Sequence, residues 1–254
     1  MSRRPGFPAR MDFGSSPAPA SARAQTRPRG DPVPAGVGLD SQAVRARMLE
    51  KLLALGIRDA QVLAAMGTVE RHRFVDTALV NQAYEDTSLP IGLGQTISKP
   101  SIVARMIELL LGGARDANGR LGRVLEIGTG CGYQAAVLGR VAAEVYSVER
   151  LRGLHDKARD NLRPMRLANV HLIFGDGVAG YAKGAPYAGI IAAAGGEAVP
   201  REWIEQLATG ARIVAPIVGA NGRQALTVIE KTSAGVKQSV LESVHFVPLK
   251  SGIA

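Results

Sequence analysis

Cysteine, aromatic residues and long apolar runs are all scarce in this chain of 254 residues. Its one cysteine, Cys131, cannot form an internal disulfide or a metal site built on cysteines, so a reducing cytoplasm is the simplest compartment. Five Phe, five Tyr and one Trp provide no evident platform on which nucleic-acid bases would stack. No apolar run approaches the roughly 20 residues of a membrane-spanning helix. We therefore expect a cytoplasmic protein with no membrane segment, no specific nucleic-acid partner and no metal.

The formal net charge is +9, and much of it lies at the start of the chain. Residues 1–38 contain six arginines, two aspartates and half of the prolines, but very few large apolar residues. Such a segment cannot bury enough surface to offset the entropy of ordering it. We predict a disordered extension over residues 1–38 and a single folded domain over residues 39–254. A transit peptide is the alternative for the extension, whereas export is disfavoured because no apolar signal segment follows.

The most informative segment covers residues 124–150 and reads VLEIGTGCGYQAAVLGRVAAEVYSVER. It predicts a buried strand, a glycine turn, a helix from about Tyr133 and a second strand that ends at Glu149. Three glycines occupy alternate positions of the turn: Gly128, Gly130 and Gly132. Glycine permits positive φ and lets a ligand approach the backbone, and the following helix points free amide groups at the same place. The segment is half of a nucleotide-binding α/β fold.

Two acidic residues flank this turn and narrow the choice of ligand. Glu149 lies about 20 residues beyond the first glycine, where an acid accepts hydrogen bonds from ribose hydroxyls. Glu126 lies just before the first glycine, where a carboxylate would repel a pyrophosphate but suits an ammonium group. Tyr133 occupies the position of the third glycine of a dinucleotide site. These features favour S-adenosylmethionine, which has an ammonium, a sulfonium and a ribose but no phosphate. A glycine-rich turn without a ligand is the alternative.

The rest of the chain alternates between helical and strand patterns. A helical period runs from near Asp40 to Gly56, a second helix is predicted over residues 59–66, and a short helical link follows over residues 71–84. Beyond the second acid we predict helices over residues 151–162 and 201–207 and strands over residues 170–174, 189–193, 211–218, 226–231 and 240–247. Alternation of this kind is typical of a doubly wound, mostly parallel sheet, and the closely spaced last strands suggest an antiparallel edge.

A second polar segment, YEDTSLPIGLGQTISKP, covers residues 84–100 and precedes an apolar helix pattern. The proline and glycines of residues 90–94 predict a loop in front of the glycine turn. Gln95, Thr96 and Ser98 would then present amide and hydroxyl donors, which suit a carboxylate or a peptide backbone. As an alternative, Ser98 is an ordinary N-cap of the following helix.

These segments closely resemble the bacterial protein-L-isoaspartate O-methyltransferases over roughly residues 40–250. The resemblance is carried by AYED (83–86), LPIGLGQTISKP (89–100), VLEIGTGCGYQAAVL (124–138), VYSVER (145–150), NVHLIFGDG (169–177) and VHFVPL (244–249). Many methyltransferases share the glycine turn, whereas GQTIS is far more specific to this family. The resemblance implies an α/β fold with a doubly wound, mostly parallel, seven-stranded Rossmann-like sheet and a helical N-terminal part.

The resemblance also implies an activity and a set of site residues. The methyl donor would be S-adenosylmethionine, and the acceptor the free α-carboxylate of L-isoaspartyl residues in damaged proteins and peptides. Ser98 and Thr96 are the implied catalytic residues, with Gln95 and Ile97 beside them at the substrate. The implied cofactor-binding residues are Glu126, Gly128, Gly130, Gly132, Glu149, Asp176 and Gly177. Asp176 should lie near the adenine, and a plain turn aspartate is its alternative. We further expect a monomer.

Three positions depart from the family pattern. Ala188 and Ala193 stand where the family commonly has an acid and a threonine, and Cys131 replaces a common serine. A polar contact to substrate or cofactor is therefore expected to be missing, which bears on efficiency more than on reaction class. A methyltransferase that acts on RNA or a small molecule, a non-catalytic binding module, and a catalytic thiol at Cys131 also stay open as interpretations.

Overall fold

The computed structural model describes residues 42–113 and 115–254. The predicted extension over residues 1–38 lies outside these residues, so its disorder and the division of the chain at residue 38 remain predictions. Of the residues described, no helix has the length and apolar character needed to cross a membrane.

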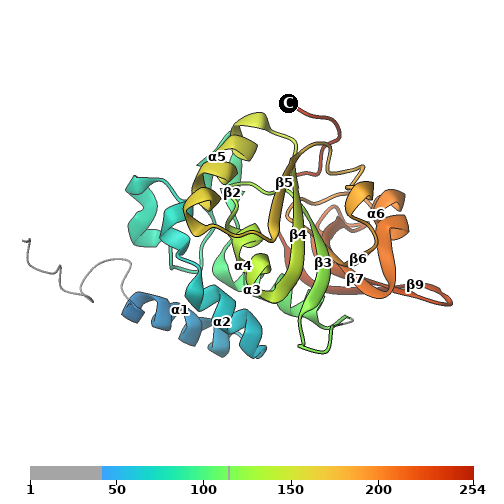
Figure 1. Cartoon of the computed structure of the whole chain (residues 1–254), viewed down its shortest axis with the longest axis horizontal. Helices are drawn as coiled ribbons and strands as arrows, with labels where there is room; N and C mark the ends of the chain where they lie inside the picture. Colours follow the sequence, from blue (N-terminus) through green and yellow to red (C-terminus); the bar gives the residue numbers. More distant parts are fainter. Residues whose placement is uncertain (1–41, 114) are drawn as a thin grey trace, which may run out of the picture. The chain divides into compact units, whose positions relative to one another are not determined.

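Seven strands form the central sheet in the order β5-β4-β3-β6-β7-β8-β9 (Figure 1). Their bounds are β3 Leu121–Ile127, β4 Ala142–Glu149, β5 Val170–Phe174, β6 Tyr187–Ala192, β7 Leu207–Val218, β8 Gln224–Thr232 and β9 Gly235–Val244. All pairings from β5 to β7 are parallel, and β8 and β9 pair antiparallel at one edge. The predicted doubly wound, mostly parallel sheet with an antiparallel edge is confirmed.

The strand order reverses beside β3. From β3 the chain passes to β4 and then to β5 at one edge, whereas β6 pairs on the other side of β3 and leads to β7. Ile127, the last residue of β3, lies opposite Val148 of β4 and Ala192 of β6. In open sheets of this kind, ligands bind at the carboxyl ends of the strands where the order reverses.

Helices cover both faces of the sheet, and successive strand residues point to opposite faces. Val124 packs with the helices α1 to α5, whereas its neighbour Leu125 packs with Trp203 of α6. The helices are α1 Gln42–Ala54, α2 Ala60–Thr68, α3 Pro100–Leu111, α4 Tyr133–Val141, α5 Arg152–Leu162 and α6 Arg201–Gln206. Short 3-10 helices occur at η1 Arg71–Phe74, η2 Thr77–Gln82, η3 Arg163–Met165 and η4 Ala182–Gly184.

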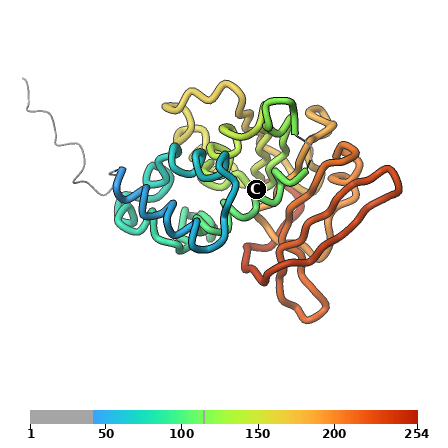
Figure 2. The backbone as a smooth tube through the Cα atoms, turned by 90° about the horizontal axis from the view of Figure 1, so that it is seen from below, coloured from blue at the N-terminus to red at the C-terminus, as the bar shows by residue number. Residues whose placement is uncertain are grey.

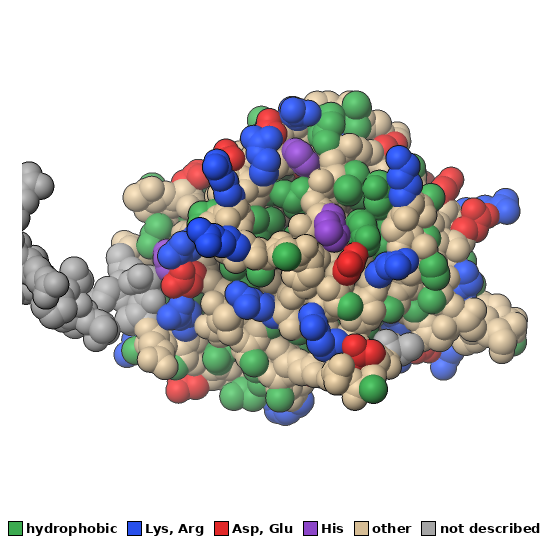
Figure 3. Space-filling view, in the orientation of Figure 1, with side chains coloured by type: hydrophobic (Ala, Val, Ile, Leu, Met, Phe, Trp, Pro, Cys, Tyr) green, Lys and Arg blue, Asp and Glu red, His purple; other side chains and the backbone are tan. Residues whose placement is uncertain are grey.

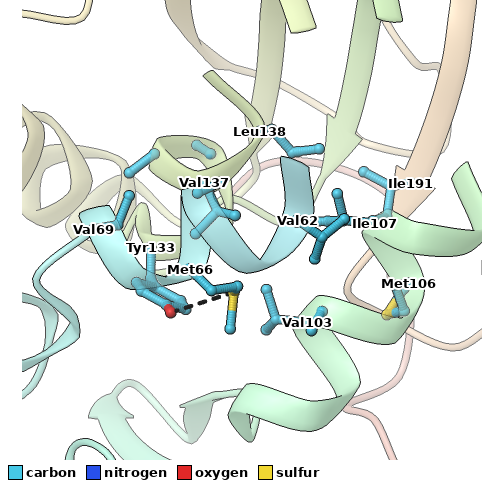
Figure 4. Packing of buried hydrophobic residues seen from close by; sticks show 14 of the residues in the cluster. Val62, Met66, Val69, Val103, Met106, Ile107, Tyr133, Val137, Leu138 and Ile191 are labelled. Carbon is cyan, nitrogen blue, oxygen red and sulfur yellow. Dashed lines mark hydrogen bonds between the residues drawn. The ribbon is translucent and has the colours of Figure 1, made fainter. Parts of the chain in front are cut away.

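The helical N-terminal part forms as its sequence predicts. α1 ends before Gly56, which has a φ of +97°, and Asp59 caps α2 by accepting two backbone N–H groups. α2 packs beside α4 and α3, with Met66 against Tyr133 and Val103 (Figure 4). The Tyr133 hydroxyl points at the Met66 sulfur, at 3.6 Å. These helices therefore pack onto the helix that follows the glycine turn.

The predicted loop over residues 90–94 is instead a two-stranded hairpin. β1 (Leu89–Gly92) pairs antiparallel with β2 (Gln95–Ile97). The turn between them places Leu93 and Gly94 at φ values of +51° and +68°. Two consecutive residues with positive φ suit a tight hairpin, but leucine rarely adopts that conformation, so the sequence carries no hairpin signal here.

The last strand lies earlier than its sequence predicts. β9 spans Gly235–Val244, and the chain then leaves the sheet, so residues 245–247 do not belong to the strand. Figure 2 shows β8 and β9 as the long hairpin near the red end of the chain. On the face seen in Figure 3, lysine and arginine side chains are scattered among acids. No single basic patch gathers on that face.

Candidate active site

A cavity of about 430 Å³ opens where β3, β4 and β6 end. Gly128 and Gly130 of the glycine turn line it, together with Glu149 at the end of β4. The β1–β2 hairpin and residues 247–250 complete its wall. The cavity therefore lies where the strand order reverses and collects segments from distant parts of the chain.

The glycine turn depends on positive φ at all three of its glycines. The values are +89° at Gly128, +58° at Gly130 and +90° at Gly132. Gly128 and Gly130 face the cavity, and the Gly128 N–H donates to the Val148 carbonyl at 2.9 Å. Gly132 packs against α5 instead, where an added Cβ would lie 3.1 Å from Leu162. Two of the three predicted glycines thus reach the cavity, and the third permits close packing.

Glu149 is fixed at the cavity wall by two backbone groups. One carboxylate oxygen accepts the Gly130 N–H and the other accepts the Leu151 N–H, both at 2.9 Å. Each oxygen keeps a second lone pair, which a ligand hydroxyl in the cavity could engage. The side chain is only 5% exposed, so its hydrogen bonds are shielded from bulk water.

Asp176 is held by backbone groups and lies outside the cavity lining. Its carboxylate accepts the Val178 N–H at 2.8 Å and the Gly252 N–H at 2.7 Å. Gly177 does line the cavity, and an added Cβ there would lie 2.6 Å from Ile127. Glycine is required at this close approach, while the predicted contact between Asp176 and adenine remains a prediction.

Glu126 lies beneath the glycine turn and is fully buried. The Ser147 hydroxyl donates to one of its oxygens, and the other has no hydrogen-bond partner among the described residues. Burial raises the pKa of Glu126 to about 8, although the side chains of Ser147 and Gln134 lower it. The residue does not line the cavity. The structure therefore places Glu126 behind the turn, and its predicted role toward the cofactor is untested.

The segment GQTIS is brought against the glycine turn. Gln95 and Thr96 line the main cavity, while Ile97 and Ser98 line a pocket of about 40 Å³ beside it. Gly128 borders both spaces. The two predicted catalytic residues, Thr96 and Ser98, thus both border spaces that the glycine turn also borders.

Ser98 is not the N-cap of α3, so that alternative is wrong. Lys99 occupies the N-cap position, and no side chain caps it. Asp86 accepts both the N–H and the hydroxyl of Ser101, each at 2.8 Å, and so satisfies the first turn of the helix. Among the described residues the Ser98 hydroxyl has no hydrogen-bond partner, which leaves it available to a ligand.

The three departures from the family pattern lie in different surroundings. Ala193 lines both the main cavity and the pocket beside it, so a threonine there would present a hydroxyl to the ligand. Ala188 packs near Gly122 and does not line the cavity. Cys131 is buried, and burial raises the pKa of its thiol to about 11. A thiol that stays protonated at neutral pH is a poor nucleophile, so a catalytic role for Cys131 is disfavoured.

Sequence reasoning missed residues that hold the site together. Residues 247–250 form part of the cavity wall, and their only sequence signal is the family segment VHFVPL. Lys157 of α5 donates to the Ile91 carbonyl at 2.8 Å and forms an ion pair with Asp76 at 3.0 Å. No pattern in the sequence marks this lysine.

Within the part of the chain that the structure describes, no cluster of three or more His, Cys, Asp or Glu side chains could hold a metal ion.

Comparison with known proteins decides the family. The model of the protein-L-isoaspartate(D-aspartate) O-methyltransferase family matches residues 43–254. The chain belongs to this family. A protein-L-isoaspartate O-methyltransferase of Methylibium petroleiphilum is 57% identical over 262 residues, which cover 98% of this chain and 96% of the relative. The enzyme of that name from Leptothrix cholodnii is 57% identical over 93% of this chain and 82% of its own length.

Solved structures agree with the isoaspartyl methyltransferase fold. One protein-L-isoaspartate O-methyltransferase superposes with a TM-score of 0.73 at 28% identity, over 82% of this chain and 67% of its own. A putative member from Plasmodium falciparum, solved with S-adenosyl-L-homocysteine, gives a TM-score of 0.67 at 24% identity, over 81% of this chain and 98% of its own. The second likeness supports the fold alone. The resemblance inferred from the sequence is thereby confirmed.

Glu126→Gln should make stability less dependent on pH. The pKa of Glu126 is 4.5 without burial and about 8 in the folded chain. Between pH 4.5 and about pH 8, Glu126 is therefore protonated in the native state and ionised in the unfolded state. The contribution of Glu126 to stability therefore falls as pH rises from about 4.5 to about 8. Urea unfolding at pH 5 and pH 8 measures the free energy of unfolding of both proteins. The value for the variant, relative to that of the native chain, should be higher at pH 8 than at pH 5 by about 1 kcal/mol or more. An equal difference at both values would contradict the raised pKa.

Glu149→Gln should weaken the binding of S-adenosylhomocysteine in calorimetry by about 10- to 100-fold, the worth of a hydrogen bond to a charged group. The substitution keeps the shape of the side chain but removes its charge and turns one acceptor into a donor. Glu144→Gln is the matched control, because Glu144 lies on the same strand and away from the cavity. Similar losses in the two variants would show that Glu149 acts through the fold and not on the ligand.

Proposed function

We propose that this chain transfers the methyl group of S-adenosylmethionine to the free α-carboxylate of L-isoaspartyl residues in damaged proteins and peptides. One observation carries the proposal. Thr96 lines the cavity that Glu149 walls, and Ser98 lines the pocket beside it, and Gly128 and Gly130 of the glycine turn border both spaces. The family to which the chain belongs supports the same reaction. The predicted monomer, cytoplasmic location and absence of a metal belong to the proposal.

The residues of the cavity fit S-adenosylmethionine. Gly128 and Gly130 expose backbone without side chains, which lets an extended ligand lie close to the turn. Glu149 would accept hydrogen bonds from the ribose hydroxyls. Apolar side chains such as Leu154 and Leu249 line other parts of the wall and suit the adenine. A pyrophosphate would fit this lining poorly. It would need the backbone N–H groups of the turn, but the Gly130 N–H already donates to the Glu149 carboxylate.

The acceptor needs orientation more than activation. An α-carboxylate with a pKa near 4 is ionised at neutral pH and requires no general base. Its oxygen forms a bond to the methyl carbon while the carbon–sulfur bond breaks, and S-adenosylhomocysteine leaves with the electron pair. We assign Ser98 and Thr96 to hold the carboxylate through neutral hydroxyls, with Gln95 and Ile97 beside it. Correct placement alone can lower the barrier by several kcal/mol.

Matched peptides that differ only in isoaspartate or aspartate test the reaction. With labelled S-adenosylmethionine, the isoaspartyl peptide should be labelled and the aspartyl peptide should not, because only the former carries a free α-carboxylate beside a side-chain-linked backbone. Equal labelling, or none, would overturn the proposed function. Transfer to RNA or to a small molecule in its place would establish the alternative.

In the same assay, Ser98→Ala should lower kcat/KM for the isoaspartyl peptide by about tenfold or more, since a hydrogen bond to a charged group is lost. Binding of S-adenosylhomocysteine should stay nearly unchanged. Ser101→Ala is the control, because the Ser101 hydroxyl is already bonded to Asp86. Loss of donor binding in the Ser98 variant would make Ser98 a structural residue.

A further inference from the structure

Arg71 is a buried cation that has no role in the proposed methyl transfer. It begins η1 and its side chain is fully buried. No carboxylate among the described residues forms an ion pair with it. Burial lowers the pKa of Arg71, but a guanidinium stays protonated in proteins. The negative charge of Asp86 acts on Arg71 from beyond ion-pair distance. Burying a charge without a directly paired carboxylate is costly, so other polar contacts must offset that cost.

The guanidinium connects three segments of the chain, which contain Ala83, Ser98 and Tyr133. Its Nε donates to the Ala83 carbonyl and its Nη2 donates to the Ser98 carbonyl, both at 2.7 Å. Its central carbon lies 4.7 Å from the centre of the Tyr133 ring, at the start of α4. Nη1 has no hydrogen-bond partner among the described residues.

These contacts join the substrate segment to the cofactor turn. Tyr133 directly follows Gly132, and Ser98 directly follows the strand that carries Thr96. The Ser98 side chain makes no hydrogen bond among the described residues. The Ser98 carbonyl, however, accepts a hydrogen bond from Arg71, and this contact holds the residue in place. The fork of a guanidinium can hold two carbonyls at fixed angles and stack on a ring at the same time, which an ammonium cannot do.

We propose that Arg71 is a positioning residue, which holds the Ser98 backbone over the glycine turn so that the Ser98 hydroxyl meets the substrate carboxylate. This inference rests on the proposed function, because it acts through the role assigned to Ser98. Arg71 itself touches neither the main cavity nor the pocket beside it. Its contribution should therefore vanish when the Ser98 hydroxyl is absent.

A double-mutant cycle between Arg71 and Ser98 tests the proposal. Arg71→Lys keeps the charge but loses the planar fork that holds the two carbonyls and stacks on Tyr133. It should lower kcat/KM for the isoaspartyl peptide by about tenfold while changing S-adenosylhomocysteine affinity by less than about twofold. In the Ser98→Ala background the same change should have almost no further effect. Arg73→Met, at an exposed neighbour paired with Glu70, is the matched control and should leave the kinetics unchanged.

Each contrary result counts against the proposal. Unchanged kinetics in Arg71→Lys, or losses that simply add to those of Ser98→Ala, would show that Arg71 does not act through Ser98. Equal loss of cofactor affinity and turnover, or an Arg71→Lys protein that stays unfolded in saturating S-adenosylhomocysteine, would assign Arg71 to the core alone. Inactivity of the unmodified chain on the isoaspartyl peptide would refute the proposed function itself, which is a separate outcome.

Discussion

The reversal of strand order beside β3 is the constraint on which the site depends. Ile127 ends β3 between two parallel neighbours, and the pairing continues just beyond it. The Gly128 N–H donates to the Val148 carbonyl at 2.9 Å, and the Ala193 N–H donates to the Ile127 carbonyl at 2.8 Å. The connections from the two sides pack on opposite faces of the sheet, so a crevice is left at this point. Glu149 reaches the crevice because its strand ends there.

The substrate segment is positioned differently, by polar contacts with helices. The hairpin that carries Thr96 has only two short strands, which could not hold a fixed place alone. Lys157 of α5 binds the Ile91 carbonyl, Arg71 binds the Ser98 carbonyl, and Asp86 satisfies the start of α3. The sheet therefore positions the cofactor side of the site. The acceptor side is positioned mainly by side chains that donate hydrogen bonds to backbone carbonyls.

This division explains how much could be predicted from the sequence. The strands and the glycine turn follow from local patterns, because apolar runs and alternate glycines report buried parallel strands and a tight turn directly. The hairpin turn at Leu93 could not be predicted, since leucine rarely has positive φ. Arg71 gives no signal either, because a single arginine in a polar link normally points to solvent. The placement of Glu126 behind the turn depends on Ser147, a contact between two strands that no local pattern contains.

The proposed reaction requires the Ser98 hydroxyl to meet the acceptor carboxylate at the glycine turn. A crystal structure with S-adenosylhomocysteine and an isoaspartyl peptide tests it most directly. We predict the peptide α-carboxylate within hydrogen-bond reach of Ser98, about 2.6–3.2 Å, with one oxygen facing the cofactor sulfur. A peptide carboxylate bound elsewhere, beyond hydrogen-bond reach of the Ser98 hydroxyl, would contradict this role of Ser98.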